Sequence, residues 1–353
     1  MRLQPGLDGN ERSIDPASLA VAARSKALRP MLVIAAGLVV LLISCVFSLH
    51  SGNFDGSVGD TRNAVFHYQS NDSFRQIVWE LRLPRMLAAA AVGACLAVSG
   101  ALMQGLTRNP LADPSILGVT QGSTLAMALG LAFAPALSNY SLMFISFIGA
   151  GVGVGFVILI GMFSRNGMTP VRLLLAGMAM GTLLGSLATA IAIHYDVARI
   201  LAFWFAGGVA GVSWNQLEAL LPAFVIGVVL AMLLARSVTL ISLDECTAQG
   251  LGANLTLIRI GGAIAVLLLT GAAVSIAGAI SFAGLLVPHL CRKLVGYDYR
   301  YMIPGAAVFG ALLLVVCDIF TRMIYPPYET PVSVLTAIVG APVLLYIARR
   351  QRS

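Results

Sequence analysis

Arginine is the residue type best placed to do chemistry in this sequence, because its planar guanidinium binds carboxylates through paired hydrogen bonds. Arg82-Leu83-Pro84-Arg85 precedes a long apolar run, and Arg322 lies near the end of another run, four residues after Asp318. That spacing places Asp318 and Arg322 on one helix face, where they can pair. The three arginines are therefore either a docking site for acidic groups on a partner, or interfacial side chains with an internal Asp318–Arg322 pair.

Two polar segments between apolar runs are further candidates. The segment from Asp244 to Gly252 is acidic at its start, can form a helix, and ends in a glycine stop. An exposed helix of this kind is either a solvated loop or a plug for a groove on a partner. The other segment is Asn109-Pro110-Leu111-Ala112-Asp113-Pro114, whose two prolines predict a turn between two helices.

Catalytic, metal and nucleotide sites find little support in the residue pattern. The four histidines have no metal-ligand companion at helical spacing, although His194 and Tyr195 are expected on the side of the arginines, where they could touch a substrate. The five cysteines form no CxxC pair, so each is expected to be a small apolar filler. Neither Lys26 nor Lys293 belongs to a GxxxxGK[ST] loop, so the chain is not expected to bind ATP in that way.

The elements that position these residues are predicted to be membrane helices. Hydrophobic residues make up 58% of the chain and charged residues 10%, and the mean hydropathy is +0.90. A soluble domain carries about 25% charged residues. Because every backbone polar group must bond internally in lipid, long uncharged runs indicate transmembrane helices. The net charge of +7 comes mostly from arginines in short loops, with no basic stripe interleaved with aromatics, which argues against nucleic-acid binding.

The uncharged runs predict ten membrane-spanning helices. Two runs are too long for one helix, and we expect them to break at Pro135 with residues 138–140, and near Gly278. Ile200–Leu217 holds three glycines and is expected to be a short re-entrant or surface helix. The ten spans fall in Met31–Leu49, Met86–Thr107, Ser115–Ser164 (two), Leu173–Ile193, Ala219–Ala235, Ile260–Cys291 (two), Tyr301–Met323 and Thr330–Ala348.

Charge predicts the orientation of these spans. Residues 1–29 are polar, lack the organisation of a signal peptide, and are expected to form a cytoplasmic tail. With this end inside, sixteen of the 22 basic residues fall in inside segments, so both termini are expected to be cytoplasmic. Glycines four residues apart are expected to let helices approach closely. They are Gly118/Gly122, Gly149/Gly153 and Gly177/Gly181/Gly185.

Taken together, these segments resemble the FecCD family, the permease subunits of type II ABC importers for siderophores, haem and cobalamin. The likeness runs from about residue 31 to 348. The chain departs from the family at Asp244, where a glycine usually precedes the glutamate. The likeness rests on Arg82-Leu83-Pro84-Arg85, Ser99-Gly100 to Gln104, Asn109 to Pro114 with Leu117-Gly118, Gly250-Leu251-Gly252, Gly278 to Leu285 with Pro288-His289 and Arg292, Asp318 with Arg322, and Gly340-Ala341-Pro342.

The resemblance implies an all-α integral membrane protein of about ten transmembrane helices, with the cobalamin-permease-like fold, in the bacterial inner membrane. Residues 30–353 then form the transmembrane permease domain. The implied partners are a second permease subunit (the same chain or a paralogue), a cytoplasmic ABC ATPase dimer, and a periplasmic or lipid-anchored substrate-binding protein. No cofactor, metal or catalytic residue is expected on this chain, and ATP hydrolysis is expected on the separate ATPase subunit. The expected cargo is a ferric siderophore, with haem or cobalamin as the alternative.

The resemblance also assigns roles to residues. Arg82, Arg85 and Arg322 match the arginines that meet glutamates on the binding protein. The segment Asp244–Gly252 looks like the coupling helix that sits in the ATPase cleft. Its expected contact residues are Asp244, Glu245, Ala248, Gly250, Leu251 and Gly252, and the candidate substrate path holds Gln104, Asn109, His194 and Tyr195.

An ion-gradient-driven secondary transporter is the alternative from another class. Such a carrier favours acidic residues at broken helices in mid-membrane. In this sequence the acidic residue well inside a predicted span is Asp318, which already has Arg322 as a partner.

Overall fold

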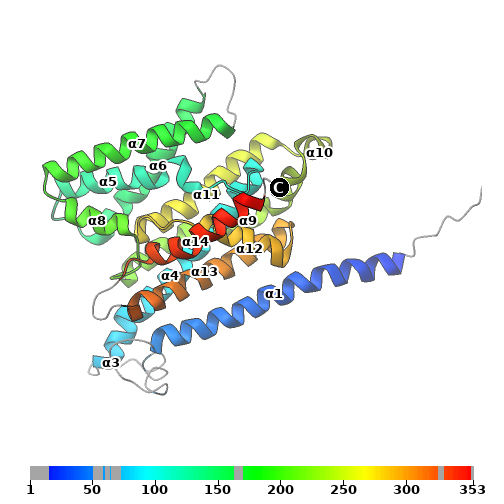
Figure 1. The fold of residues 1–353 in the computed structure, drawn as a ribbon, viewed down its shortest axis with the longest axis horizontal. Helices are drawn as coiled ribbons and strands as arrows, with labels where there is room; N and C mark the ends of the chain where they lie inside the picture. The colour runs from blue at the N-terminus through cyan, green and yellow to red at the C-terminus, as the bar shows by residue number, and fades with distance from the viewer. Residues whose placement is uncertain are drawn as a thin grey trace, which may run out of the picture.

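The computed structural model describes residues 16–50, 59, 64, 73–162, 170–324 and 330–350, and within these ranges the regular structure is helical throughout. The helices run broadly side by side, with α3 and α8 at one end of the molecule and α10 at the other (Figure 1). They are α1 (Pro16–His50), α3 (Ser73–Gln76), the π-helix η1 (Ile77–Arg82), α4 (Leu83–Thr107), the 3₁₀ helix η2 (Pro114–Leu117), α5 (Val119–Phe133), α6 (Asn139–Met162), α7 (Pro170–His194), α8 (Ala198–Ala206), α9 (Trp214–Leu243), α10 (Glu245–Gly250), α11 (Leu255–Ala277), α12 (Ala283–Val295), α13 (Tyr299–Ile324) and α14 (Val332–Arg350).

The all-α membrane fold is confirmed, and in the described residues a helix lies at each of the ten predicted positions, in the predicted order. Among the described residues, seven helices are long and apolar enough to cross a membrane, and the third and tenth spans are shorter apolar helices, Val119–Phe133 and Val332–Tyr346. The eighth span, α12, has only 13 residues. A helix of that length rises about 20 Å, less than the roughly 30 Å hydrocarbon core. α12 is therefore too short to cross the membrane by itself as a helix, and the residues before it, 278–282, are not helical.

The predicted break near Gly278 is confirmed. Gly278 ends α11 with a φ of 64°, and a Cβ there would lie 2.2 Å from the Trp204 carbonyl oxygen, so only glycine fits. The predicted split at Pro135 is also confirmed, since α5 ends at Phe133 and α6 begins at Asn139. The surface helix predicted over 200–217 is shorter than expected, because Gly207, with a φ of 65°, ends α8 at Ala206.

The segment predicted as a cytoplasmic tail is partly helical. α1 begins at Pro16 and continues through Pro30 to His50, so its first turns precede the apolar part of the helix. Residues 1–15 lie outside the described residues. The boundary at residue 29 stays a prediction.

α4 is the central helix of the bundle. It is the most buried of the seven candidate spans, with 83% of its apolar window inside the protein, and it packs against α9, α11, α12 and α13. Glycines allow α4 to approach two of these helices closely. A Cβ at Gly93 would lie 2.2 Å from the Gly310 oxygen, and one at Gly100 would lie 2.0 Å from the Gly284 oxygen. The absence of side chains at these positions lets the backbones touch.

The predicted glycine packing is confirmed between α5 and α6. A Cβ at Gly122 would meet the Gly149 oxygen at 2.3 Å, and one at Gly153 would meet the Gly118 oxygen at the same distance. Gly185 on α7 makes no such contact within this chain, because a Cβ there would meet nothing within 4 Å. That glycine faces open space rather than another helix of this chain.

The cysteine prediction is confirmed for the three buried thiols. Cys95, Cys291 and Cys317 are buried, and all five cysteines are free. Cys246 contradicts the filler prediction, because it is exposed on α10. In the ranges that the structure describes, no group of three or more His, Cys, Asp or Glu side chains could hold a metal.

Candidate functional site

The first candidate site lies where α4 begins. The π-helix η1 runs directly into α4, and π-helical turns are frequent at functional sites. Pro84 is the second residue of α4 and has no N–H to donate to the preceding turn, at the point where the helix changes from π to α geometry. This local structure carries Arg82 and Arg85 into the protein at the end of the bundle.

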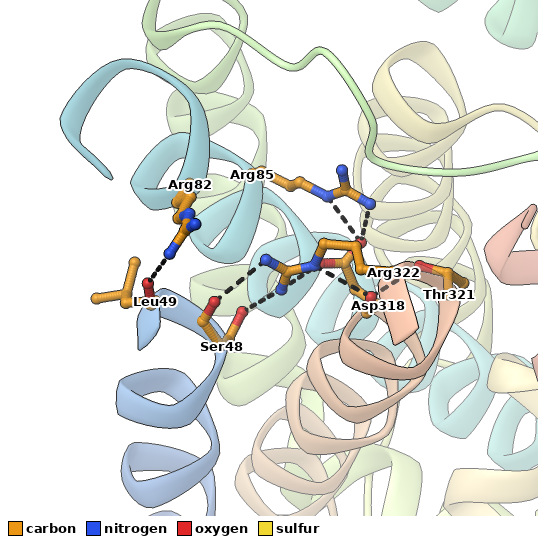
Figure 2. Close-up of polar contacts among 7 residues, drawn as sticks. All are labelled: Ser48, Leu49, Arg82, Arg85, Asp318, Thr321 and Arg322. Carbon is orange, nitrogen blue, oxygen red and sulfur yellow. Dashed lines mark hydrogen bonds and ion pairs between the residues drawn. The ribbon is translucent and has the colours of Figure 1, made fainter. Parts of the chain in front are cut away.

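A buried carboxylate joins two of the predicted docking arginines. Asp318 on α13 lies 2.8 Å from Nη2 of Arg85 and 3.0 Å from Nη2 of Arg322. The Asp318 side chain is 1% exposed, whereas those of Arg85 and Arg322 are 12% and 13% exposed. Figure 2 shows the two guanidinium groups reaching this carboxylate from opposite sides. The predicted Asp318–Arg322 pair is confirmed, and Arg85 is an additional partner that the sequence did not reveal.

The same arginines hold the end of α1. Arg82 donates from Nη1 to the carbonyl oxygens of Leu49, at 2.9 Å, and His50, at 3.2 Å. Arg322 donates to the Ser48 hydroxyl at 2.6 Å and to its carbonyl oxygen at 3.1 Å. The last carbonyls of a helix lack partners within the helix and attract cations. We call Arg82, Arg85, Arg322 and Asp318 the arginine cluster; it joins the ends of α1, α4 and α13 (Figure 2).

The arginine cluster has the chemistry of a carboxylate-binding site. Guanidinium groups outnumber carboxylates among the seven residues drawn in Figure 2, and each guanidinium has a fixed orientation. The structure shows the internal pairing that one of the two sequence interpretations predicted. The docking role of Arg82, Arg85 and Arg322 stays a prediction.

The second candidate site is the short helix α10 at the opposite end. Asp244 caps this helix, because its carboxylate accepts from the Thr247 N–H at 2.8 Å and from the Thr247 hydroxyl at 2.9 Å. These bonds, the backbone bond first, lower the pKa of Asp244. The φ of Asp244 is −162°, an extended conformation open to any residue. The departure from the family's usual glycine is therefore accommodated without strain and adds a helix cap.

The outer face of α10 is exposed and partly apolar. Ala248 is fully buried against the protein, whereas Gly250 and Gly252 face open space and Leu251 is 67% exposed. Leu243 and Leu257, just before and after this segment, are also largely exposed. An exposed helix rimmed by leucines suits a groove on a partner better than a solvated loop.

The four candidate path residues are not brought together. Gln104 is buried between α4 and α12, where it donates to the Gly284 carbonyl oxygen at 3.3 Å and accepts from Arg292. Asn109 closes an exposed turn by accepting from the Leu111 N–H at 3.0 Å, near the α10 end. His194 and Tyr195 are exposed at the end of α7, next to α8 (Figure 1). Their role in a substrate path stays a prediction.

A cavity near the arginine cluster was missed by the sequence reasoning. It has a volume of about 290 Å³ and is lined by Arg85, Trp204, the glycine-rich stretch 207–212 and residues 330–332. The Trp204 indole N–H is buried without a hydrogen-bond partner among the described residues. The run of glycines was the available signal, because glycines let the backbone turn and line a cavity.

Comparison with known proteins agrees with this architecture. The FecCD transport family matches residues 40–350. The chain is 49% identical over 341 residues to the iron(3+)-hydroxamate import system permease protein FhuB of Bacillus subtilis, covering 97% of this chain and 89% of that protein. It is 42% identical over 330 residues to the Fe(3+)-citrate import system permease protein YfmD of the same organism, covering 94% and 97%.

A solved structure matches as well. The structure of a metal-chelate type ABC transporter in an inward-facing conformation aligns with a TM-score of 0.78 and 30% identity, covering 90% of this chain and 98% of that one. The chain belongs to the FecCD transport family. It is a multi-pass membrane protein of the permease type.

Proposed function

We propose that this chain is the channel-forming permease subunit of an ATP-driven importer that brings a ferric siderophore, first of all a ferric hydroxamate, into the bacterial cytoplasm. The observation that carries this proposal is the 49% identity to a hydroxamate import permease over 97% of the chain. The two polar sites at opposite ends fit the two soluble partners of such an importer.

The proposed orientation places α10 in the cytoplasm and the arginine cluster outside the inner membrane. The beginning of α1 and the end of α14 both lie at the α10 end (Figure 1). The excess of basic residues in the segments of that end supports this orientation. Both termini are then cytoplasmic.

At the outer end, the arginine cluster is the proposed docking site for a binding protein that presents glutamates. Arg82, Arg85 and Arg322 come from three elements, η1, α4 and α13, but lie together, so one acidic lobe of the binding protein can contact all three. Each guanidinium is already oriented by internal bonds. Such preorganisation reduces the entropy lost on docking.

At the inner end, α10 is the proposed coupling helix for a cytoplasmic ATPase dimer. ATP binding draws the ATPases together, and Asp244–Gly252 passes this motion to the membrane helices. A second permease subunit, either a copy or a paralogue, completes the path. Access then alternates between outside and inside, and no covalent bond of the cargo is made or broken.

A secondary transporter is disfavoured by the surroundings of Asp318. A carboxylate that binds a coupling ion must exchange partners during transport. Asp318 instead lies between two arginines, at 2.8 and 3.0 Å, and is almost completely buried.

The experiment that tests this proposal is uptake of a labelled panel in cells with and without the gene. The panel holds several ferric hydroxamates, ferric citrate, haem and cobalamin. Gene-dependent uptake of a ferric hydroxamate is the expected result. Gene-dependent uptake of haem or cobalamin alone would overturn the cargo, and no gene-dependent uptake of any chelate would overturn the importer.

A further inference from the structure

One carboxylate at the start of α10 binds arginines from two other helices. Glu245 accepts from Arg108 at 3.0 Å and from Arg259 at 2.7 Å. Arg108 follows the last residue of α4, and Arg259 lies in the second turn of α11. We propose that Arg108 and Arg259 are positioning residues that clamp Glu245, and with it the coupling helix α10, onto the inner ends of α4 and α11. This inference rests on the proposed coupling role of α10.

The backbone of Arg108 supports a task for its side chain. Arg108 caps α4 with a φ of 51°, in the left-handed region where glycine is the usual residue. An arginine in this position carries a backbone cost that glycine would avoid. The guanidinium that results is placed on Glu245, 137 positions further along the chain.

α4 connects this clamp with the arginine cluster. Arg85 lies in the first turn of α4, and Arg108 follows its last turn. Between them the helix is the most buried span, and its backbone touches α13 at Gly93 and α12 at Gly100. A helix packed this closely moves as a rigid body, because its contacts cannot deform gradually. A shift at the docking end is therefore expected to reach Glu245.

The clamp fixes the position of α10 and is expected to add little to the stability of the folded protein. All three side chains are at least partly exposed, and exposed ion pairs add little to folding. Variants at these positions are therefore expected to fold. A second exposed pair at the same end, Arg300 with Asp298, joins neighbouring residues of one segment and supplies a matched control.

The direct test measures the distance between α10 and α4 in the chain itself. Spin labels are attached to the native, exposed Cys246 and to Asn109→Cys in the turn after Arg108, with Cys45→Ala removing the half-buried thiol in α1. Pulsed electron resonance then gives the distance distribution. The clamp predicts a narrow distribution that broadens at least twofold in Glu245→Gln and stays narrow in Arg300→Gln.

Charge inversion separates clamping from direct contact with the ATPase. Glu245→Arg alone places three cations together and is expected to broaden the distribution and lower uptake of radioiron-labelled ferrichrome at least fivefold. The combination Arg108→Glu, Glu245→Arg and Arg259→Glu rebuilds the clamp with reversed signs and is expected to restore a narrow distribution. Arg108→Gly, which suits the backbone but removes one partner, is expected to broaden it.

The clamp is overturned if the distribution in Glu245→Gln is as narrow as in the parent, or if the inverted combination does not narrow it again. The two proposals fail separately. If the distance distribution changes in these variants but the chain imports no chelate, the clamp is retained and the proposed function is overturned. If the chain imports ferrichrome but the distance distribution does not change in these variants, only the clamp is overturned.

Discussion

Arg85 and Asp318 lie 233 positions apart in the sequence, yet the Arg85 guanidinium is 2.8 Å from the Asp318 carboxylate. The same carboxylate binds Arg322, four residues further along α13. One buried acidic side chain thus fixes two arginines from different helices. The arrangement makes Asp318 the residue on which the geometry of the arginine cluster depends.

Asp318→Asn is therefore expected to destabilise the protein. Removing the charge leaves two largely buried guanidinium groups without their carboxylate, and breaking a buried ion pair costs about 3–5 kcal/mol. Thermal unfolding of the purified chain in detergent checks this expectation, with the exposed-pair variant Arg300→Gln as control. An unfolding temperature equal to that of the wild type would show that the cluster does not depend on Asp318.

Reversing the charge at two arginines tests whether the arginine cluster docks a binding protein. The double variant Arg82→Glu and Arg322→Glu is expected to abolish chelate uptake, because acidic groups on a partner would then be repelled. The basal ATPase rate of the assembled complex is expected to persist, because α10 lies at the opposite end of the molecule (Figure 1). The measurement compares uptake in cells with ATP hydrolysis by the purified complex.

The control for docking is Arg199→Glu, an exposed arginine at the same end, in the first turn of α8. It should leave uptake unchanged. Because Arg82 and Arg322 also bind the end of α1, the amount of each variant in the membrane is measured alongside. Full uptake by the double variant would remove the docking site from the account.

The sequence predicted local relationships in this site and missed distant ones. The Asp318–Arg322 pair follows from helical spacing, and the break at Gly278 follows from the conformational freedom of glycine. The contacts of Arg85 with Asp318, and of Arg108 with Glu245, depend on how distant helices pack. The hydrophobic periodicity of a single sequence does not show which distant helices pack together.

Leu251 tests the coupling role of α10. Leu251→Glu is expected to reduce the amount of ATPase that co-purifies with the tagged chain about tenfold, because a charge would replace an apolar contact in the partner's groove. Thermal stability should hardly change, since the side chain is 67% exposed. The matched control is Tyr297→Glu, an exposed apolar residue between α12 and α13. Equal recovery of ATPase with both variants would contradict the proposed groove contact.

Gly93 tests the close packing of α4. A Cβ there would lie 2.2 Å from the Gly310 carbonyl oxygen, so Gly93→Ala must push two backbones apart. Overpacking of this kind costs about 1–3 kcal/mol, and a lower unfolding temperature in detergent is expected. Gly155→Ala on α6 is the control, because nothing lies within 4 Å of its new methyl group. Equal unfolding temperatures for the two variants would show that α4 is not tightly held.

Other differences between prediction and structure have physical causes. The length of α12 was not predicted, because the apolar run continues across the unwound residues 278–282 and hides the gap between two helices. The place of Gln104 on a substrate path stays a prediction, but the contacts of its side chain were not predicted. The Gln104 side chain binds the Gly284 carbonyl oxygen and Arg292, and a buried amide usually has such hydrogen-bond partners.

The energy source of uptake distinguishes an ATP-driven importer from an ion-coupled carrier. Cells that carry this gene are loaded with the labelled chelate that the uptake panel identifies, and either ATP is depleted or the membrane potential is collapsed with an uncoupler while ATP is maintained. An ATP-driven importer predicts that uptake stops on ATP depletion and continues with the uncoupler. Uptake that survives ATP depletion but stops with the uncoupler would contradict the account and identify an ion-coupled carrier.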